Sequence, residues 1–292
     1  MFDQAEAFLS LLDRFKRYWA KRKQAPAEES VASRFLRLFA AHGVHRNQIP
    51  RFFGHGLQLR DVQEEATLMH FLTDAHLADA CDLFGVERQW LERGEGHAHK
   101  RHHFYLQPVQ FGRFLDGLLA SKNLPDMEMN ATLFGVLASR DLESSLVLSE
   151  PIGLLNEEVI YRYHFVDGGP LGYWKARVSA AALVAQAINR NVWVIGRLCD
   201  TKLLRELTYV KDLVGMHEHE LLMENSRRFE VEDWLLEPAV LLEGLDPERN
   251  NFGVTSALKF WLQFNADGLT KIPYSQPDTE ARFAATLEKA TG

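Results

Sequence analysis

The sequence contains few cysteines and no long apolar run. Its 292 residues include only Cys81 and Cys199, which form no paired motif, so we expect a reducing, cytoplasmic setting and no zinc or disulfide framework. No stretch approaches the roughly 18 apolar residues that cross a bilayer, so no membrane association is expected. The first ten residues carry Asp3 and Glu6 and no basic residue ahead of their apolar positions, unlike a secretory signal. We find no internal repeat and no low-complexity tract.

The composition is that of a globular protein with an uneven charge. Hydrophobic residues make up 46% of a 33.4 kDa chain, enough for one large or two ordinary domains. Residues 1–60 hold 11 of the 33 Lys and Arg but only 5 of the 40 Asp and Glu, although the net charge is −7. A basic first part on an acidic body favours a polyanion partner for that part alone. A solvated helix face over "KRYWAKRK" would give the same charge pattern.

Helical periodicity dominates the first third of the chain. Residues 1–30 comprise an expected basic amphipathic helix over 2–23 and a linker with Pro26, with Ser30 as a candidate N-cap for the next helix. Several short helical patterns follow in a compact all-α domain at 31–95. Glycines stand where these helices would be capped at their C-terminal ends, namely Gly43, Gly54, Gly85 and Gly94.

The character changes after "RGEGHAHKRHH" (93–103), which we interpret as a mobile linker. Residues 103–292 are predicted to form an α/β domain with a helical tail from Val231. The predicted strands cover 103–107, 131–138, 144–150, 158–166 and 191–198. The predicted helices cover 108–121, 171–189 and 201–215. The alanine-rich 171–189 helix is expected to pack on the sheet or in a dimer.

Residues 46–62, "RNQIPRFFGHGLQLRDV", have the pattern of a helix-turn-helix. A first helix would end at Gly54, and a second would begin at Leu57, which is the geometry that places a recognition helix in the major groove. The alternative is two packed helices without a DNA role. Amide and guanidinium side chains at the first helix would contact phosphates, and those of the second helix would read base edges. The candidates are Arg46, Asn47, Gln48 and Arg51 for phosphates, and Gln58, Arg60 and Gln63 for bases.

These residues, with "LADACDLFGVERQWLERGEG" (77–96), resemble the lambda-repressor-like (Cro/C1, XRE-type) helix-turn-helix domain over Ser33 to Glu95. The positions that match the family pattern are Gly43, Val44, Ile49, Phe53, Gly54, Leu77, Ala78, Phe84, Val86, Trp90, Leu91, Gly94 and Glu95. The resemblance implies a five-helix fold and binding to double-stranded DNA. The sequence departs from the family where Pro50 replaces a usual alanine and where Asp61, if exposed on the second helix, would repel phosphate.

Other polar clusters give weaker signals. Four linker histidines offer metal ligands, but without a nearby carboxylate or cysteine we favour a basic linker over a metal site; they are His97, His99, His102 and His103. "HEHE" (217–220) is interpreted as a solvated loop. "VDGGPLGYW" (166–174) is interpreted as a turn with Pro170 at the first position of a helix rather than as a phosphate loop. Ionisable groups near strand ends form no recognisable catalytic set, namely Glu157, Glu158, His164 and Asp167.

The sequence therefore predicts an α+β multidomain protein with an N-terminal all-α lambda-repressor-like domain and a C-terminal α/β domain. The expected function is a DNA-binding transcriptional regulator, a homodimer whose C-terminal domain senses a small-molecule effector or dimerises. We expect no catalytic residue, no metal and no cofactor. The alternatives are an adaptor whose helix-turn-helix fold does not bind DNA, and an enzyme in the α/β domain.

Overall fold

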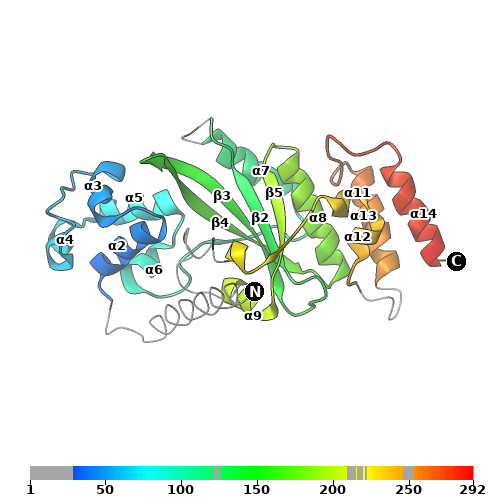
Figure 1. The fold of residues 1–292 in the computed structure, drawn as a ribbon, viewed down its shortest axis with the longest axis horizontal. Coiled ribbons are helices and arrows are strands. Elements are labelled where there is room, and N and C mark those ends of the chain that lie inside the picture. Colours follow the sequence, from blue (N-terminus) through cyan, green and yellow to red (C-terminus); the bar gives the residue numbers. More distant parts are fainter. Residues whose placement is uncertain are drawn as a thin grey trace, which may run out of the picture.

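The computed structural model describes residues 29–121, 124, 126–208, 215, 220, 222–245 and 253–291. The expected helix at 2–23 and the end of the expected 201–215 helix lie outside these residues, as does most of "HEHE". The described chain is α+β: a helical part, a six-stranded mixed sheet, and a second group of helices follow one another along the molecule (Figure 1).

The helical part begins at the predicted cap. The Ser30 side chain accepts a hydrogen bond from the Ser33 N–H at 3.0 Å, which satisfies one free donor at the start of the first helix. Gly85 and Gly94 adopt left-handed conformations as C-caps, as predicted. The elements are α2 (Val31–Ala41), η1 (Arg46–Gln48), α3 (Ile49–Phe52), α4 (Glu65–Phe71), α5 (Asp74–Phe84) and α6 (Arg88–Arg93).

The prediction of a second helix in the helix-turn-helix is wrong. Residues 57–64 form a loop with turns at 59–63, and α4 begins only at Glu65. Gly54, His55 and Gly56 all have positive φ angles, and the Asp61 carboxylate accepts the Gln58 N–H at 2.8 Å, which holds a turn in place of a helix. The expected first helix is also divided, into η1 and α3. Pro50 lies in the first turn of α3, where its missing N–H breaks no intrahelical bond.

The sheet has the order β1-β4-β3-β2-β5-β6. Its strands are β1 (Arg101–His103), β2 (Asn130–Gly135), β3 (Glu143–Leu155), β4 (Glu158–Pro170), β5 (Trp193–Leu198) and β6 (Arg227–Phe229). Strands β2, β3 and β4 form an antiparallel meander, and β5 returns parallel to β2. Only Asn156 and Glu157 join β3 to β4, and both have positive φ, as a tight hairpin turn requires.

Two helices cover one face of the sheet. Apolar side chains of α7 (Pro108–Ala120) and α8 (Trp174–Ile188) form one core with Leu146, Leu148 and Val166, and α8 is buried along almost its whole length. This confirms that the alanine-rich helix packs on the sheet. The opposite face carries a smaller apolar cluster with α9 (Thr201–Thr208).

Two local predictions at the sheet are wrong. The first strand lies at Arg101–His103 rather than at 103–107, because its backbone pairs with β4 while the following residues turn into α7. Pro170 ends β4, and α8 starts four residues later at Trp174. The reason is the long pairing of β3 with β4, which extends the strand through Gly169 and seats Gly168 directly against the Ser144 side chain.

The tail after β6 is helical, as predicted. It comprises α11 (Asp233–Leu236), α12 (Pro238–Leu242), α13 (Val254–Ala266) and α14 (Thr279–Thr291), which join the α8 side of the core. No helix in the described part of the chain is long and apolar enough to cross a membrane.

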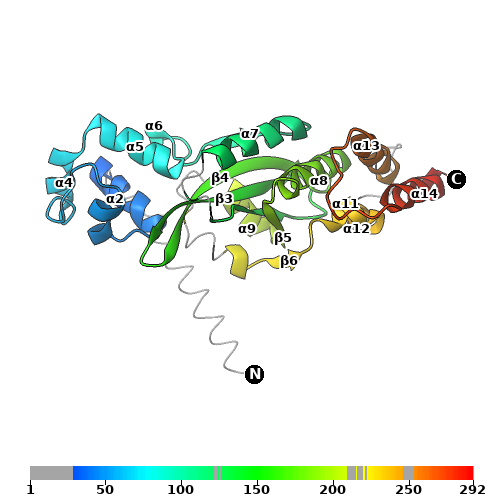
Figure 2. The ribbon, with the colours of Figure 1, turned by 90° about the horizontal axis from the view of Figure 1, so that it is seen from above.

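The β3–β4 hairpin reaches from the sheet to the helical part (Figure 2). Ile152, Leu155 and Ile160 of the hairpin belong to the same buried cluster as the helical part's apolar residues. Gly153 lies so close to Phe52 that an added Cβ would come within 2.5 Å of the ring. The two predicted domains therefore share a core at this junction.

Candidate functional site

The predicted phosphate-contacting residues lie on the surface of the helical part, but several are engaged with one another. Gln63 donates from Nε2 to Asn47 Oδ1 and to the Leu59 carbonyl, both at 2.9 Å. Arg46 donates from Nη1 to the Gln63 carbonyl at 2.7 Å. The structure thus brings a predicted base reader and two predicted phosphate ligands into one hydrogen-bonded group.

The other predicted contacts are dispersed. Arg51 donates to Asn156 Oδ1 of the β3–β4 turn at 2.7 Å, and Gln48 accepts the His45 N–H at 2.9 Å as part of a cap. Gln58 and Arg60 are exposed on the turns at 57–64 and do not share a helix face. Asp61, which would have repelled phosphate on an exposed helix face, is buried.

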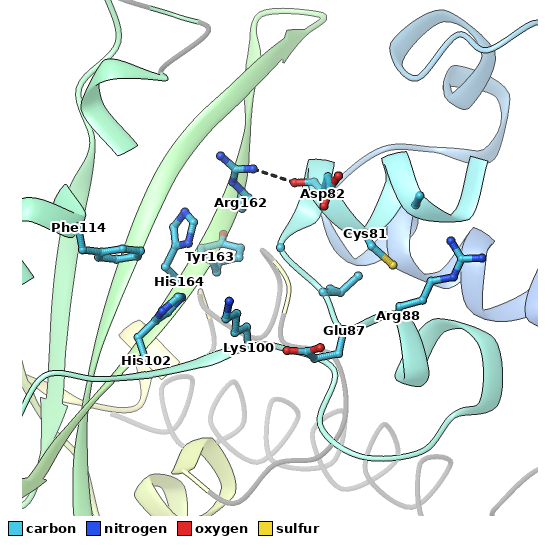
Figure 3. A pocket seen from close by; sticks show the side chains of 13 residues that line it. Cys81, Asp82, Glu87, Arg88, Lys100, His102, Phe114, Arg162, Tyr163 and His164 are labelled. Carbon is cyan, nitrogen blue, oxygen red and sulfur yellow. Dashed lines mark hydrogen bonds between the residues drawn. The ribbon is translucent and has the colours of Figure 1, made fainter. Parts of the chain in front are cut away.

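A cavity of about 500 Å³ lies between the helical part and the sheet (Figure 3). Its helical wall comes from the end of α5, the following turn and the start of α6, with Cys81, Asp82, Gly85 and Arg88 among its residues. The opposite wall comes from β1 and the segment leading into it, from α7 and from β4. This wall contributes Lys100, His102, Phe114, Arg162, Tyr163 and His164.

Strand geometry explains why these side chains meet. Lys100 and His102 are two residues apart, as are Arg162 and His164, and side chains two apart on an extended chain point to the same face. Glu150 of β3 is the direct cross-strand partner of Arg162, which places its carboxylate on that same face. Arg162 and His164 of β4 therefore lie between the Glu150 carboxylate of β3 and the His102 imidazole of β1.

Glu150 contacts both Arg162 and His164 of β4. Its carboxylate accepts two hydrogen bonds from Arg162, at 2.8 and 2.7 Å, and lies 2.6 Å from His164 Nε2. Burial alone would raise the pKa of the Glu150 carboxyl, but the hydrogen bonds from His164 and Arg162 outweigh it, so its pKa lies below the ordinary value. The ionised carboxylate therefore holds the ring of His164 in a fixed orientation.

His102 has the opposite surroundings. Its ring lies 4.6 Å from the Phe114 ring and 6.2 Å from the His164 ring, between centroids. Burial, and then the nearby charges of His164 and Lys100, lower the pKa of His102 to about 4. The site therefore holds an imidazole that is uncharged at neutral pH beside a second imidazole that hydrogen-bonds to a carboxylate.

The remaining cations differ in their availability. Arg88 is bound to Glu92 and Asp74, and its guanidinium points away from the histidines (Figure 3). Lys100 forms no ion pair with any residue in the described ranges, and its amine points toward the histidines. It is the lining cation best able to meet an incoming negative charge.

The sequence did not predict this site, because residues 93–103 have the pattern of a mobile linker. In the structure His99 is buried and pairs with Val86 in an isolated bridge, and His102 lines the cavity. The alternation "HAHKRHH" was the available signal, since polar residues two apart also suit an edge strand. His103 falls on the other face, where Nδ1 contacts Asp167 at 3.0 Å.

Among the described residues no cluster of three or more His, Cys, Asp or Glu has the arrangement of a metal site. The chain matches no protein-family model, no curated protein and no solved structure. The lambda-repressor-like resemblance of residues 33–95 thus stays an expectation from the sequence. The geometry of the cavity carries the functional argument.

Proposed function

We propose that the protein is a nucleic-acid-binding regulator that also binds an anionic group in the cavity between its helical part and its sheet. The observation that carries the proposal is the convergence of Lys100, His102 and His164 on one open cavity. The lining holds three cationic side chains against two carboxylates, Asp82 and Glu87, and Lys100 is the cation that forms no ion pair within the described ranges, so it can meet an anionic group.

The position of the cavity supports regulation. Its walls come from both parts of the molecule, and Arg162 donates to the Asp82 carbonyl at 2.7 Å across the junction. A ligand in this position would contact both parts at once, so its binding energy would favour one arrangement of them. Such a ligand would lie against Arg162, whose hydrogen bonds to Glu150 and to the Asp82 carbonyl link the sheet to the helical part.

The nucleic-acid contact is proposed at the exposed arginines of the helical part, as a phosphate-binding surface rather than as a recognition helix. Arg46, Arg51 and Arg60 are exposed there, with Arg46 on η1, Arg51 on α3 and Arg60 in the following turns. Double-stranded DNA and a homodimer that spans two half-sites remain the proposed partner and assembly.

The experiment measures two kinds of binding by the full chain. Inorganic phosphate, titrated by calorimetry, is expected to bind, and Lys100→Ala is expected to weaken it about tenfold through loss of one charge-assisted contact. Random duplex DNA is expected to bind with a steep salt dependence, and Arg46→Ala with Arg51→Ala should weaken all sequences alike. Absence of DNA binding at low salt, or of phosphate binding, would remove the corresponding half of the proposal.

A second candidate is an adaptor that binds protein. Three large apolar side chains of the helical part are exposed: Leu59 at 57%, Met69 at 46% and Phe71 at 43%. Two of them lie on α4, and exposed apolar side chains are candidates for contact with a partner protein. If duplex DNA does not bind, protein binding through these side chains becomes the better explanation of the helical part.

A further inference from the structure

The cavity provides acid–base groups but no activated nucleophile of its own. Its lining contains no serine or threonine, and burial raises the pKa of the Cys81 thiol to about 11, which keeps it protonated. A reaction in this cavity therefore depends on a nucleophile that the substrate or water supplies.

The two histidines suit opposite roles in such a reaction. His102 makes no hydrogen bond within the described part of the chain, so its ring nitrogens are available to a substrate. His164 is held at 2.6 Å by Glu150, which Arg162 in turn holds with two hydrogen bonds. An imidazole whose ring nitrogens are free can accept a proton from a substrate, and one that a carboxylate holds in place can deliver a proton to a fixed position.

We propose that this cavity is a catalytic site that cleaves RNA phosphodiesters, with His102 as general base, His164 as general acid and Lys100 as the counter-charge. The inference rests on the proposed function, because it identifies the bound anionic group as a phosphodiester. Glu150 and Arg162 are positioning residues, which act through His164.

The proposed step is an internal transesterification. His102 takes the proton of a ribose 2′-hydroxyl while the 2′-oxygen forms a bond to the adjacent phosphorus. The bond from phosphorus to the 5′-oxygen breaks, and that oxygen takes the proton of His164. The products are a 2′,3′-cyclic phosphate and a 5′-hydroxyl, no redox change occurs, and proton exchange with solvent restores both rings.

Lys100 and the substrate itself account for the rest of the chemistry. The non-bridging oxygens of the phosphate gain negative charge as the 2′-oxygen attacks, and the Lys100 ammonium stabilises that charge. The substrate's own hydroxyl replaces the nucleophile that the lining lacks, and its position next to the phosphorus provides the advantage of proximity. DNA has no 2′-hydroxyl, so the same site would bind its phosphate without cleaving it.

The test incubates the full chain with a fluorescein-labelled single-stranded RNA oligonucleotide in EDTA and identifies the products by mass spectrometry. Cleavage with a 2′,3′-cyclic phosphate end is expected, while a 2′-O-methyl oligonucleotide of the same sequence stays intact. His102→Asn and His164→Asn should each lower the rate about 100-fold or more. The matched control is His103→Asn, which alters the neighbouring exposed histidine on the other face of the strand and should leave the rate unchanged.

Glu150→Gln separates positioning from packing. It keeps the size of the side chain but removes the carboxylate that holds the His164 ring, so kcat for RNA cleavage should fall while KM stays close to the wild-type value. Wild-type protein that binds inorganic phosphate but leaves RNA intact would overturn the catalytic inference and keep the proposed function. Cleavage of the 2′-O-methyl oligonucleotide, or equal rates for the His102→Asn and wild-type proteins, would overturn it as well. Absence of phosphate binding by the wild-type protein would overturn both the catalytic inference and the proposed anion site.

Discussion

Substitution of the buried Arg177 tests the packing that holds the sheet and the C-terminal helices together. Arg177 lies on α8 and is fully buried. It donates to the carbonyls of Leu171 and Leu137 at 2.7 Å each, and to those of Leu241 and Glu243 at 3.0 Å each. Burial lowers the pKa of Arg177 to about 10, so the side chain remains charged at neutral pH.

Arg177→Met would retain the apolar stem but remove all four donors. Each buried carbonyl left without its donor costs about 1–3 kcal/mol, and relief of the buried charge offsets part of the total. The loss of the guanidinium from the Trp234 ring, which lies 5.0 Å from it, adds a smaller term. We expect the variant to lose about 3–5 kcal/mol of unfolding free energy.

The assay is urea-induced unfolding followed by tryptophan fluorescence. Arg177→Lys, which keeps the charge but not the forked geometry, should fall between wild type and Arg177→Met. The control is Arg228→Met, which removes an exposed ion pair with Glu230 and should change stability by less than about 1 kcal/mol. If Arg177→Met unfolds without denaturant, the Lys variant provides the measurement. A loss below about 1 kcal/mol in Arg177→Met would show that the hydrogen bonds only balance the cost of burying the charge.

Three further predictions concern the cavity and the junction. Glu150→Ala should destabilise the fold by about 3 kcal/mol, because it leaves Arg162 and His164 without their buried partner; in thermal unfolding, an unchanged Tm would contradict this. Burial lowers the pKa of His102 in the folded state. The contribution of the uncharged ring to the free energy of unfolding is therefore complete above pH 6.5 and is lost as the pH falls toward 4. That difference corresponds to about 3 kcal/mol, which solvent screening at this partly exposed ring reduces to about 1–2 kcal/mol. His102→Asn should therefore flatten the decline in stability between pH 6.5 and 4, and an identical slope would refute it. Gly153→Ala should destabilise the fold by about 1–3 kcal/mol through overpacking against Phe52, and no change in urea unfolding would mean that the hairpin moves freely at this contact.

Local rules of the sequence predicted those elements whose signals lie within a few residues. The Ser30 cap, the glycine C-caps and the alanine-rich α8 follow from neighbouring side chains and backbone preferences. The antiparallel pair β3–β4 was also visible as two apolar runs, although pairing lengthened both strands. The turns at 57–64 were not predicted, because Leu59 and Val62, three residues apart, fit turns as well as a helix. The buried Asp61 carboxylate, which accepts the Gln58 N–H, favours the turns.

By itself the sequence determined the helical first third, the main strands and the helical tail, because periodicity and capping act over short distances. Only the tertiary structure decided where the cavity forms. His102 and His164 lie far apart in the chain, and the parallel pairing of β1 with β4 and the cross-strand register of β3 with β4 bring them together with Glu150. Register depends on the whole sheet and on the hairpin's packing against the helical part. No local pattern near "HAHKRHH" contains that information, so a segment that resembled a linker became one wall of the site.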